Sequence, residues 1–398
     1  MTAVRVKSVV SNPVVKSDGS ALPFLGLEDL ESQTGRLLTD QLPLKEADDS
    51  IQHREGDVLF SKLRPYLAKS FLPHSPGTAT GELLVLRPGP LVDERFLFYA
   101  TLSSPWVEWA NTTAYGIKMP RTSWDLIGEY RMWLPSREEQ RRISKFLDAA
   151  TAQIGRLGEA MRQQIAVLAE RRSRALDSVW PVRDTPSKRL GYGTQLVTSG
   201  SRGWADFVGD FGSLFFRSAN LRRDSLQPNL TSLAYVQLPT SVKTEALRSQ
   251  IRKGDVLVGI TGANTGWTTF ADDSIEGGNV SQHVCLVRPA RDEIDGRWLA
   301  YLIASPTVQT RLLGSQYGGT KTQLSLPDIR DIRVPVLSLQ KQQGLAAEVD
   351  GLLESLDQQR DLRKRQLGVL AERRQALITA TVTGQIDVSA ASGRGIED

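Results

Sequence analysis

The six residues VLAERR occur twice in this chain of 398 residues, at 167–172 and at 369–374. The two copies lie 202 positions apart, and the same offset aligns further identical residues without a gap over nearly sixty positions. These identities are Tyr115 and Gly116 with Tyr317 and Gly318, Ser123 with Ser325, Ile127 with Ile329, Arg131 with Arg333, Gln140 with Gln342, and Asp148 with Asp350. An internal repeat of this length predicts a fold built from two related halves.

Upstream of these segments the match is sparser and the offset changes. The aligned stretches are REGDVLFSK at 54–62 with RKGDVLVGI at 252–260, LVLRP at 84–88 with CLVRP at 285–289, and SSPWV at 103–107 with ASPTV at 304–308. Each half therefore has a variable front part and a faithful back part. We expect the two halves to be related by a pseudo-twofold axis.

The faithful back parts have the sequence pattern of long helices. Apolar residues recur three and four positions apart, which places them on one face of a helix. No proline interrupts either segment, whereas Pro135 and Pro335 precede them and Pro181 and Gly384 follow them. The residues expected to pack the helices together are Ile143, Leu147, Ile154 and Leu157 in the first helix and Leu345, Val349, Leu352 and Leu356 in the second.

A helix of about 43 residues is ~65 Å long and, with a single apolar face, requires a partner. The obvious partner is the duplicate helix, and a twofold relation makes the pair antiparallel. The sequence therefore predicts an antiparallel coiled coil. In VLAERR we expect Val, Leu and Ala to pack, and Glu and Arg to form solvated or partner-facing edges.

The variable front parts have strand and short-helix patterns. GDVLF at 56–60 and GDVLVGI at 254–260 each join a turn to an apolar run, and further strands are expected in 81–88 and 281–289. The fold class is thus α+β: two mixed α/β domains with twisted β-sheets, joined by two long antiparallel coiled-coil helices. The expected divisions are 1–135, a helix at 136–180, 181–337, a helix at 338–384, and a flexible tail at 385–398.

Composition narrows the function classes. The net charge of +4 and pI of about 9.1 fit an anionic partner, although a coding preference for Arg would give the same excess. The single cysteine, Cys285, excludes internal disulfides and is expected in a strand core, and the three histidines lack the spacing of a zinc site. Because the sequence has no long apolar run and no signal-peptide pattern, we expect a cytoplasmic protein without membrane contact.

Common catalytic motifs are missing from the sequence. It has neither a phosphate-binding loop ending in Lys-Ser or Lys-Thr nor the Asn-Pro-Pro-aromatic stretch of DNA amino-methyltransferases. GITGANTG at 259–266 lacks the strand-to-helix context of a dinucleotide loop. It is either a loop with turns only or, as we expect, a polar loop whose Thr261, Asn264 and Thr265 face a nucleic acid.

Two donor-rich segments occupy equivalent places in the halves but differ in sequence: AYGIKMPRTSW at 114–124 and QYGGTKTQLSL at 316–326. Lys, Arg, Thr and Gln suit phosphates and base edges, and two different DNA half-sites require equivalent placement with different residues. FSKLRPYLAKSF at 60–71 adds basic residues, although any one of them could be a solvated surface charge. The candidate DNA-binding residues are Lys62, Arg64, Tyr66, Lys69, Tyr115, Lys118, Arg121, Thr122, Thr261, Asn264, Thr265, Tyr317, Thr320, Lys321, Thr322 and Gln323.

Three segments together carry a family resemblance. They are GDVLFSKLRPYL followed by GELLVLRP, YGIKMPRTSWDLIGEYRMWLPSREEQRRISKFLD, and its repeat YGGTKTQLSLPDIRDIRVPVLSLQKQQ, the last two each followed by a long helix containing VLAERR. Over nearly its whole length the chain resembles the specificity subunits of type I restriction-modification systems. The resemblance implies two target-recognition domains, each binding one half of a bipartite, asymmetric site in double-stranded DNA, and helices that set the spacer length.

The resemblance also implies a chain without a catalytic centre. Its helices would dock methyltransferase subunits, two in number, and through them the restriction and translocase subunits. S-adenosylmethionine, ATP and Mg²⁺ would be used by those partners, with no cofactor bound by this chain. Lys341 stands where the family usually has Glu before Gln342, which implies a weaker or asymmetric dock on that side.

Two other function classes remain open. A duplicated coiled-coil scaffold that binds other proteins would explain the repeat, but it has no evident need for two unlike donor-rich loops. A fused restriction-methylation enzyme with its own active site would require the nucleotide and methyl-donor motifs that the sequence lacks. The sequence therefore favours DNA recognition without catalysis.

Overall fold

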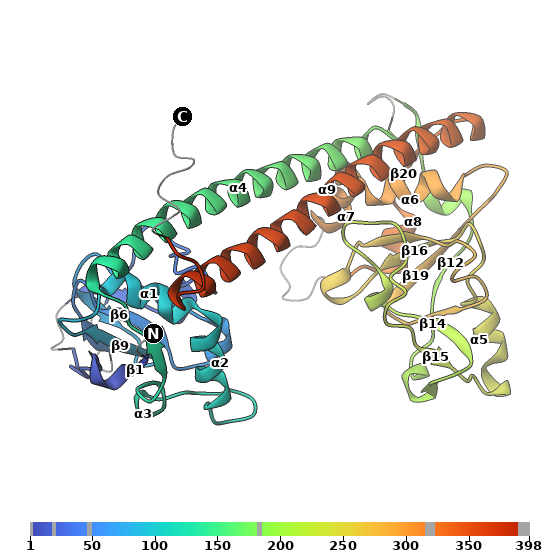
Figure 1. Cartoon of the computed structure of the whole chain (residues 1–398). Helices are drawn as coiled ribbons and strands as arrows, with labels where there is room; N and C mark the ends of the chain where they lie inside the picture. Colours follow the sequence, from blue (N-terminus) through green and yellow to red (C-terminus); the bar gives the residue numbers. More distant parts are fainter. Residues whose placement is uncertain (1–2, 18–20, 46–49, 181–184, 315–322, 389–398) are drawn as a thin grey trace. The chain divides into compact units, whose positions relative to one another are not determined.

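The computed structural model describes residues 3–17, 21–45, 50–180, 185–314 and 323–388 (Figure 1). The chain divides into two compact units, one formed by Met1–Arg162 with Lys364–Asp398 (unit 1) and the other by Gln163–Arg363 (unit 2). Each unit contains β-sheets, short helices and a length of both long helices. The expected α+β class is confirmed.

Unit 1 contains two four-stranded sheets and a two-stranded sheet, ordered β2-β9-β6-β7, β4-β3-β8-β5 and β1-β10. Its strands are β1 (Ala3–Arg5), β2 (Val10–Ser11), β3 (Leu22–Leu25), β4 (Leu44–Lys45), β5 (Ile51–His53), β6 (Val58–Ser61), β7 (Ser70–Phe71), β8 (Gly77–Ala79), β9 (Leu83–Pro88) and β10 (Arg131–Trp133). Its helices are α1 (Glu94–Leu102), α2 (Ser104–Thr112), α3 (Trp124–Ile127) and the first part of α4 (Arg137–Asp177).

Unit 2 repeats this organisation, with sheets ordered β12-β19-β16-β17, β13-β15-β14-β18 and β11-β20. Its strands are β11 (Ser187–Arg189), β12 (Thr194–Ser199), β13 (Val208–Gly209), β14 (Ser213–Phe216), β15 (Tyr235–Val236), β16 (Val256–Gly259), β17 (Thr268–Phe270), β18 (Asn279–Val280), β19 (Val284–Pro289) and β20 (Arg333–Pro335). Its helices are α5 (Lys243–Arg248), α6 (Gly296–Ala304), α7 (Pro306–Gly314), α8 (Leu326–Arg330) and the first part of α9 (Leu339–Val382). The strand order is the same in one four-stranded sheet and in the two-stranded sheet of each unit, but it differs in the other four-stranded sheet. The pseudo-twofold relation stays a prediction.

The repeated GDVL and RP segments are joined by an ion pair in each unit. Asp57, just before β6, accepts from Nε and Nη2 of Arg87 on β9, both at 2.7 Å. In the same way, Asp255 accepts from Nε and Nη2 of Arg288 on β19, at 2.9 and 2.7 Å. Each carboxylate thus fixes its strand against the neighbouring one. Cys285, also on β19, is fully buried, as expected for a residue of the strand core. Burial raises the pKa of its thiol to about 12.

The glutamine that opens each long helix anchors that helix to its sheet domain. Gln140 is fully buried, accepts from the Asp93 backbone N–H at 2.7 Å, and donates to the Leu91 and Pro135 carbonyls at 3.0 and 2.8 Å. Gln342 makes the equivalent three bonds, to Asp295, Glu293 and Leu337, at 2.8, 2.9 and 3.0 Å. Each glutamine therefore attaches the start of its long helix to the segment that precedes α1 or α6.

The two long helices span 41 and 44 residues, close to the expected bounds, and lie side by side within each unit (Figure 1). In unit 1 a Cβ at Gly158 would lie 3.8 Å from Leu367, and Arg374 donates to the Thr151 carbonyl at 3.1 Å. The residue numbers rise along one helix while they fall along the other. Antiparallel pairing is therefore confirmed.

The residues expected to pack the two helices together lie in different surroundings. Ile143, Leu147, Leu345 and Val349 are buried, but they belong to the cores of the two sheet domains. Ile154 and Leu356 are half-buried. Leu157 and Leu352 are 48% and 52% exposed, so their expected packing is wrong. In a straight α-helix, a row of residues spaced seven apart rotates around the helix axis by about 20° per seven residues. A single partner helix therefore covers such a row over only part of its length.

VLAERR also differs from expectation. Leu168 is buried, but Val167 and Val369 are 47% and 61% exposed. The final arginine of each copy is largely buried: Arg374 Nη2 donates to the Thr34 carbonyl at 3.0 Å, and Arg172 pairs with Asp357 on α9 at 3.5 Å. Burial lowers the pKa of both guanidinium groups. The expected solvated edge is thus wrong for the second arginine, because its long side chain reaches acceptors between the elements.

We expect Arg374→Ala to lower the unfolding free energy of unit 1 by about 1–3 kcal/mol, because two carbonyl groups lose a charged donor. Arg373→Ala, at the exposed neighbouring position, should change it little. Denaturant unfolding of both variants measures the difference. Equal losses would show that the Arg374 contacts contribute nothing.

The chain beyond α9 does not begin as a flexible tail. Gly384 has a φ of 74°, and the backbone N–H of Gln385 donates to the Ala380 carbonyl at 2.8 Å, as at many helix ends. A Cβ on Gly384 would lie 3.2 Å from the ring of Trp133. Ile386 and Val388 then pack into the unit 1 core. The expectation is wrong for 385–388, and 389–398 lie outside the described residues.

Candidate nucleic-acid interface

Three segments meet at an equivalent place in each unit, which we call the junction. In unit 1 the Lys62 N–H donates to the Glu82 carbonyl at 2.8 Å, and the Thr122 N–H donates to the Lys62 carbonyl at 2.9 Å. A further bridge pairs Leu63 with Arg121. The junction therefore joins the end of β6, the residue before β9 and the donor-rich segment.

The junction of unit 2 has the same backbone hydrogen bonds. The Ile260 N–H donates to the His283 carbonyl at 3.0 Å, and the Leu324 N–H donates to the Ile260 carbonyl at 2.8 Å. Thr261 forms the bridge with Gln323. One backbone frame thus presents Leu63, Glu82 and Arg121 in unit 1, and Thr261, His283 and Gln323 in unit 2.

The junction of unit 1 contains a bidentate ion pair between Arg121 and Glu82. Arg121 donates from Nε and Nη2 to the Glu82 carboxylate at 3.1 and 2.9 Å. This hydrogen bonding lowers the pKa of Glu82 and raises the pKa of Arg121. The pair therefore stays charged across the neutral range, and Arg121 has a fixed orientation.

The donor-rich loop of unit 1 is closed by its own backbone. Tyr115 and Arg121 exchange two backbone hydrogen bonds, both 2.9 Å long, and Gly116 has a φ of 97° inside the loop. Tyr115, Ile117 and Lys118 are exposed on it. The Arg64 N–H, in a left-handed conformation with a φ of 50°, donates to the Pro120 carbonyl at 2.8 Å.

The structure therefore gathers most of the unit 1 candidates. Lys62 and Arg121 are half-buried, and Arg64, Tyr66, Tyr115 and Lys118 are exposed. One candidate is wrong as a DNA contact. Thr122 is 1% exposed, because neighbouring side chains of an extended segment point to opposite sides. Lys69 directs its ammonium to the Leu27 carbonyl at 2.6 Å.

In unit 2 the junction opens into a groove of about 620 Å³, lined among others by Arg202, Thr261, Gln282, His283 and Gln323. Thr261 Oγ1 lies 2.6 Å from His283 Nδ1, and Gln282 Nε2 lies 3.1 Å from His283 Nε2. When the Gln282 amide donates to Nε2, Nδ1 carries the proton and donates to Thr261. Among the described residues that line it, this groove presents hydroxyl, imidazole and amide groups beside the guanidinium of Arg202.

The glycine-rich loop contributes less than expected. Thr265 is 6% exposed and donates to the Gly262 carbonyl at 2.7 Å, so it is wrong as a DNA contact. Asn264 donates to the Ser218 carbonyl at 2.7 Å. Thr265 thus satisfies a carbonyl group of its own turn, as short polar residues commonly do, whereas Asn264 bonds to a segment 46 positions away in the sequence. Tyr317, Thr320, Lys321 and Thr322 lie outside the described residues.

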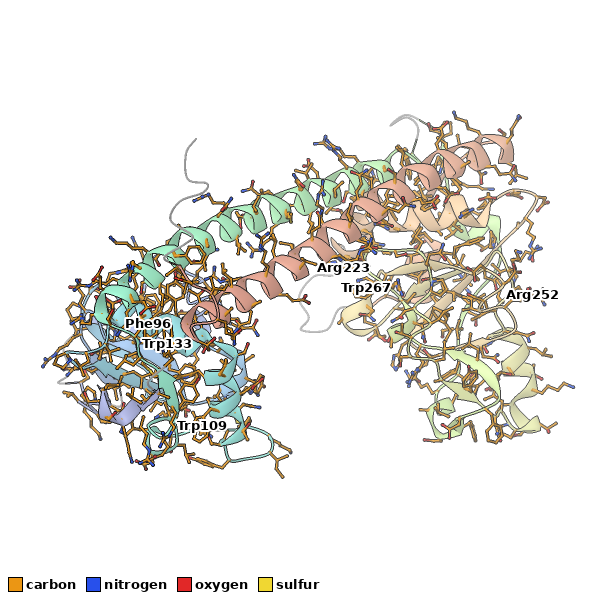
Figure 2. All side chains as sticks on the ribbon, in the orientation of Figure 1. Phe96, Trp109, Trp133, Arg223, Arg252 and Trp267 are labelled. Carbon is orange, nitrogen blue, oxygen red and sulfur yellow. The ribbon has the colours of Figure 1, made fainter. Side chains whose placement is uncertain are left out.

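A second groove of unit 2, of about 600 Å³, lies beside this loop. Arg222, Arg223 and Trp267 line it, and Figure 2 shows Arg223 and Trp267 near one another. Arg172 also lines it but is engaged by Asp357. The groove adds exposed positive charge to unit 2.

Sequence reasoning missed Glu82, Gln282 and His283. Glu82 precedes the strand segment LLVLRP, and Gln282 and His283 precede the equivalent segment VCLVRP. The residues at this place differ between the halves, whereas both strand segments are apolar and end in Arg-Pro. The criterion applied to the donor-rich loops, equivalent place with different residues, would have found them. The apolar residues that follow them indicate a buried strand, so the sequence pattern at this place predicts core residues.

Within the described residues, no group of three or more His, Cys, Asp or Glu side chains could hold a metal ion. No helix among those residues is long and apolar enough to cross a membrane.

Comparison with known proteins agrees with the geometry. No protein-family model matches the sequence. The specificity subunit of the type I restriction enzyme EcoDI, from Escherichia coli, is 26% identical over 116 residues, which is 29% of this chain and 26% of that protein. The match thus spans about a quarter of the length of that curated relative.

Two solved structures are similar over almost the whole chain. One, from work on complex assembly and conformational transition of the type I restriction-modification system, has a TM-score of 0.77 at 20% identity and covers 97% of this chain and 98% of its own. The HsdS subunit from Thermoanaerobacter tengcongensis has a TM-score of 0.51 at 19% identity, with 97% of each chain covered. The resemblance predicted from sequence is confirmed: this chain has the fold of the specificity (HsdS) subunits of type I restriction-modification systems.

Proposed function

We propose that this chain is the DNA-specificity subunit of a type I restriction-modification complex. The observation that carries the proposal is the pair of junctions, in which the same backbone frame presents different side chains. A protein that recognises two unlike half-sites requires this arrangement. Each unit binds one half of a bipartite, asymmetric DNA site, and the donor-rich segments contact base edges and phosphates.

The chemistry of the two junctions suits DNA in different ways. Unit 1 combines the cations Lys62, Arg64, Lys118 and Arg121 with Tyr115, which favours phosphate and guanine contacts. Unit 2 combines Thr261, His283 and Gln323 beside Arg202. The half-sites therefore differ in base sequence.

The long helices set the spacer between half-sites and dock two methyltransferase subunits, which in turn bring restriction and translocase subunits. Glu139 and Lys341 flank the buried glutamines at equivalent helix starts, where Ser136 and Ser338 each accept a backbone N–H at 3.3 Å. The side chains of Gln140 and Gln342 are used by hydrogen bonds inside the fold. The two surfaces that bind methyltransferase subunits therefore differ at Glu139 and Lys341. S-adenosylmethionine, ATP and Mg²⁺ act in the partner subunits, and this chain contributes recognition without catalysis.

A binding experiment tests the proposal. In a complex with its methyltransferase subunits, Arg64→Ala combined with Lys118→Ala should weaken DNA binding and reduce the slope of log affinity against log salt by about 2, since each phosphate contact contributes about 0.9. Arg202→Ala should reduce the slope by about 1 through the other unit. Unchanged binding in both variants would favour the protein-scaffold alternative.

A further inference from the structure

We infer that Glu82 is a positioning residue that holds Arg121 to recognise a guanine, and that positions 82 and 283 determine which base each unit prefers at this point of its half-site. The inference rests on the proposed DNA recognition and deepens it. It identifies the base and the pair of side chains responsible.

The geometry of the ion pair leaves one edge of Arg121 for DNA. Glu82 occupies Nε and one proton of Nη2, as the distances of 3.1 and 2.9 Å show. Within the described part of the chain, the opposite edge, formed by Nη1 and the second Nη2 proton, makes no hydrogen bond. This edge has the two parallel donors that match O6 and N7 of guanine in the major groove.

The ion pair is not needed to shape the loop. The side chains of Arg121 and Glu82 are 39% and 33% exposed, and ion pairs at such exposure contribute little to stability. Backbone bonds already close the loop between Tyr115 and Arg121 and attach Thr122 to Lys62. What Glu82 adds is a single orientation of a long side chain, which lowers the entropy lost on binding.

The same frame in unit 2 lacks both partners. His283 replaces Glu82, and Gln323 replaces Arg121, so no guanidinium stands at this position. His283 is instead bonded to Thr261 and Gln282. A glutamine amide matches N6 and N7 of adenine better than guanine. The second half-site should therefore have no guanine preference at the equivalent base pair.

The loss-of-function test uses the complex with methyltransferase subunits and DNA that carries each of the four base pairs at every position of the wild-type site. Glu82→Ala should lower the preference for guanine roughly 10- to 100-fold at one base pair of one half-site and leave the other half-site unchanged. Arg121→Ala should affect the same base pair, and adding Glu82→Ala to it should cause no further loss. Thermal unfolding and normal recognition of the second half-site control for folding.

The gain-of-function test exchanges the pair. His283→Glu combined with Gln323→Arg should create a guanine preference at the equivalent base pair of the second half-site, which a purely structural role for Glu82 would not produce. Glu82→Gln keeps the shape of the side chain and replaces Glu82→Ala in the test if that variant unfolds. It should retain part of the guanine preference of the first half-site.

Three results would overturn the inference: an unchanged base preference in Glu82→Ala, equal losses at both half-sites, or no gain in a folded exchange variant. A wild-type complex that shows no sequence preference would instead contradict the proposed function itself. The two failures are therefore distinguishable.

Discussion

Asp255→Ala should lower the unfolding free energy of unit 2 by about 3–5 kcal/mol, because it leaves the buried Arg288 without its counter-charge. The side chains of Arg288 and Asp255 are only 10% and 2% exposed. Asp255 also accepts the Arg252 backbone N–H at 2.8 Å, so a turn loses its cap in the same variant. Equilibrium denaturant unfolding followed by tryptophan fluorescence measures the loss.

The chain provides two controls for this experiment. Asp273 pairs with Lys253 at 2.8 Å in the same unit, but both side chains are well exposed, so Asp273→Ala should leave stability nearly unchanged. Asp57→Ala removes the equivalent pair of unit 1, where Arg87 is 29% exposed and can regain water. Its loss should fall between the other two, and three equal losses would contradict a role for burial.

Gln140→Ala and Gln342→Ala should each lower stability by about 2–4 kcal/mol, because each leaves a backbone N–H and two carbonyl groups without a partner. Gln342→Glu should be nearly as harmful, since a carboxylate accepts from Asp295 but faces the Glu293 and Leu337 carbonyls with no proton to donate. The long helices would also lose their attachment to the sheet domains. Under the proposed function, reduced DNA methylation by the complex should accompany the loss.

Gln343→Ala provides the matched control, since Gln343 is the exposed neighbour of Gln342 on the same helix. Its unfolding midpoint should stay close to that of the original chain. If Gln343→Ala and Gln342→Ala unfold alike, the three hydrogen bonds of Gln342 do not anchor the helix.

The sequence was sufficient for the architecture because its signals are local and repeated. Prolines before the helices and Gly384 after the second one fix the helix ends, and the repeat requires a second copy of every element found once. Helix periodicity could not decide which apolar face meets which neighbour. Ile143 and Val349 pack into the sheet domains, while Leu157 and Leu352 remain about half exposed.

The candidate site was harder to predict, because side-chain direction and tertiary contacts decide it. Arg121 and Thr122 are adjacent in sequence, yet Arg121 is half-buried and paired with Glu82, while Thr122 is buried. Glu82 lies 39 positions from Arg121 in the sequence, so only the fold shows that the two touch. The same limit applies to Arg374, whose carbonyl acceptors come from α4 and from the loop at Thr34.

Methylation mapping tests whether the two units, which share one backbone frame, recognise two different half-sites. Genomic DNA from cells that express this chain with its methyltransferase subunits should be methylated at adenine within a bipartite motif, in which two unlike short segments flank a spacer of fixed length. Glu82→Ala should then relax one position in one segment only. A single continuous motif, or two identical segments, would contradict the recognition of two unlike half-sites.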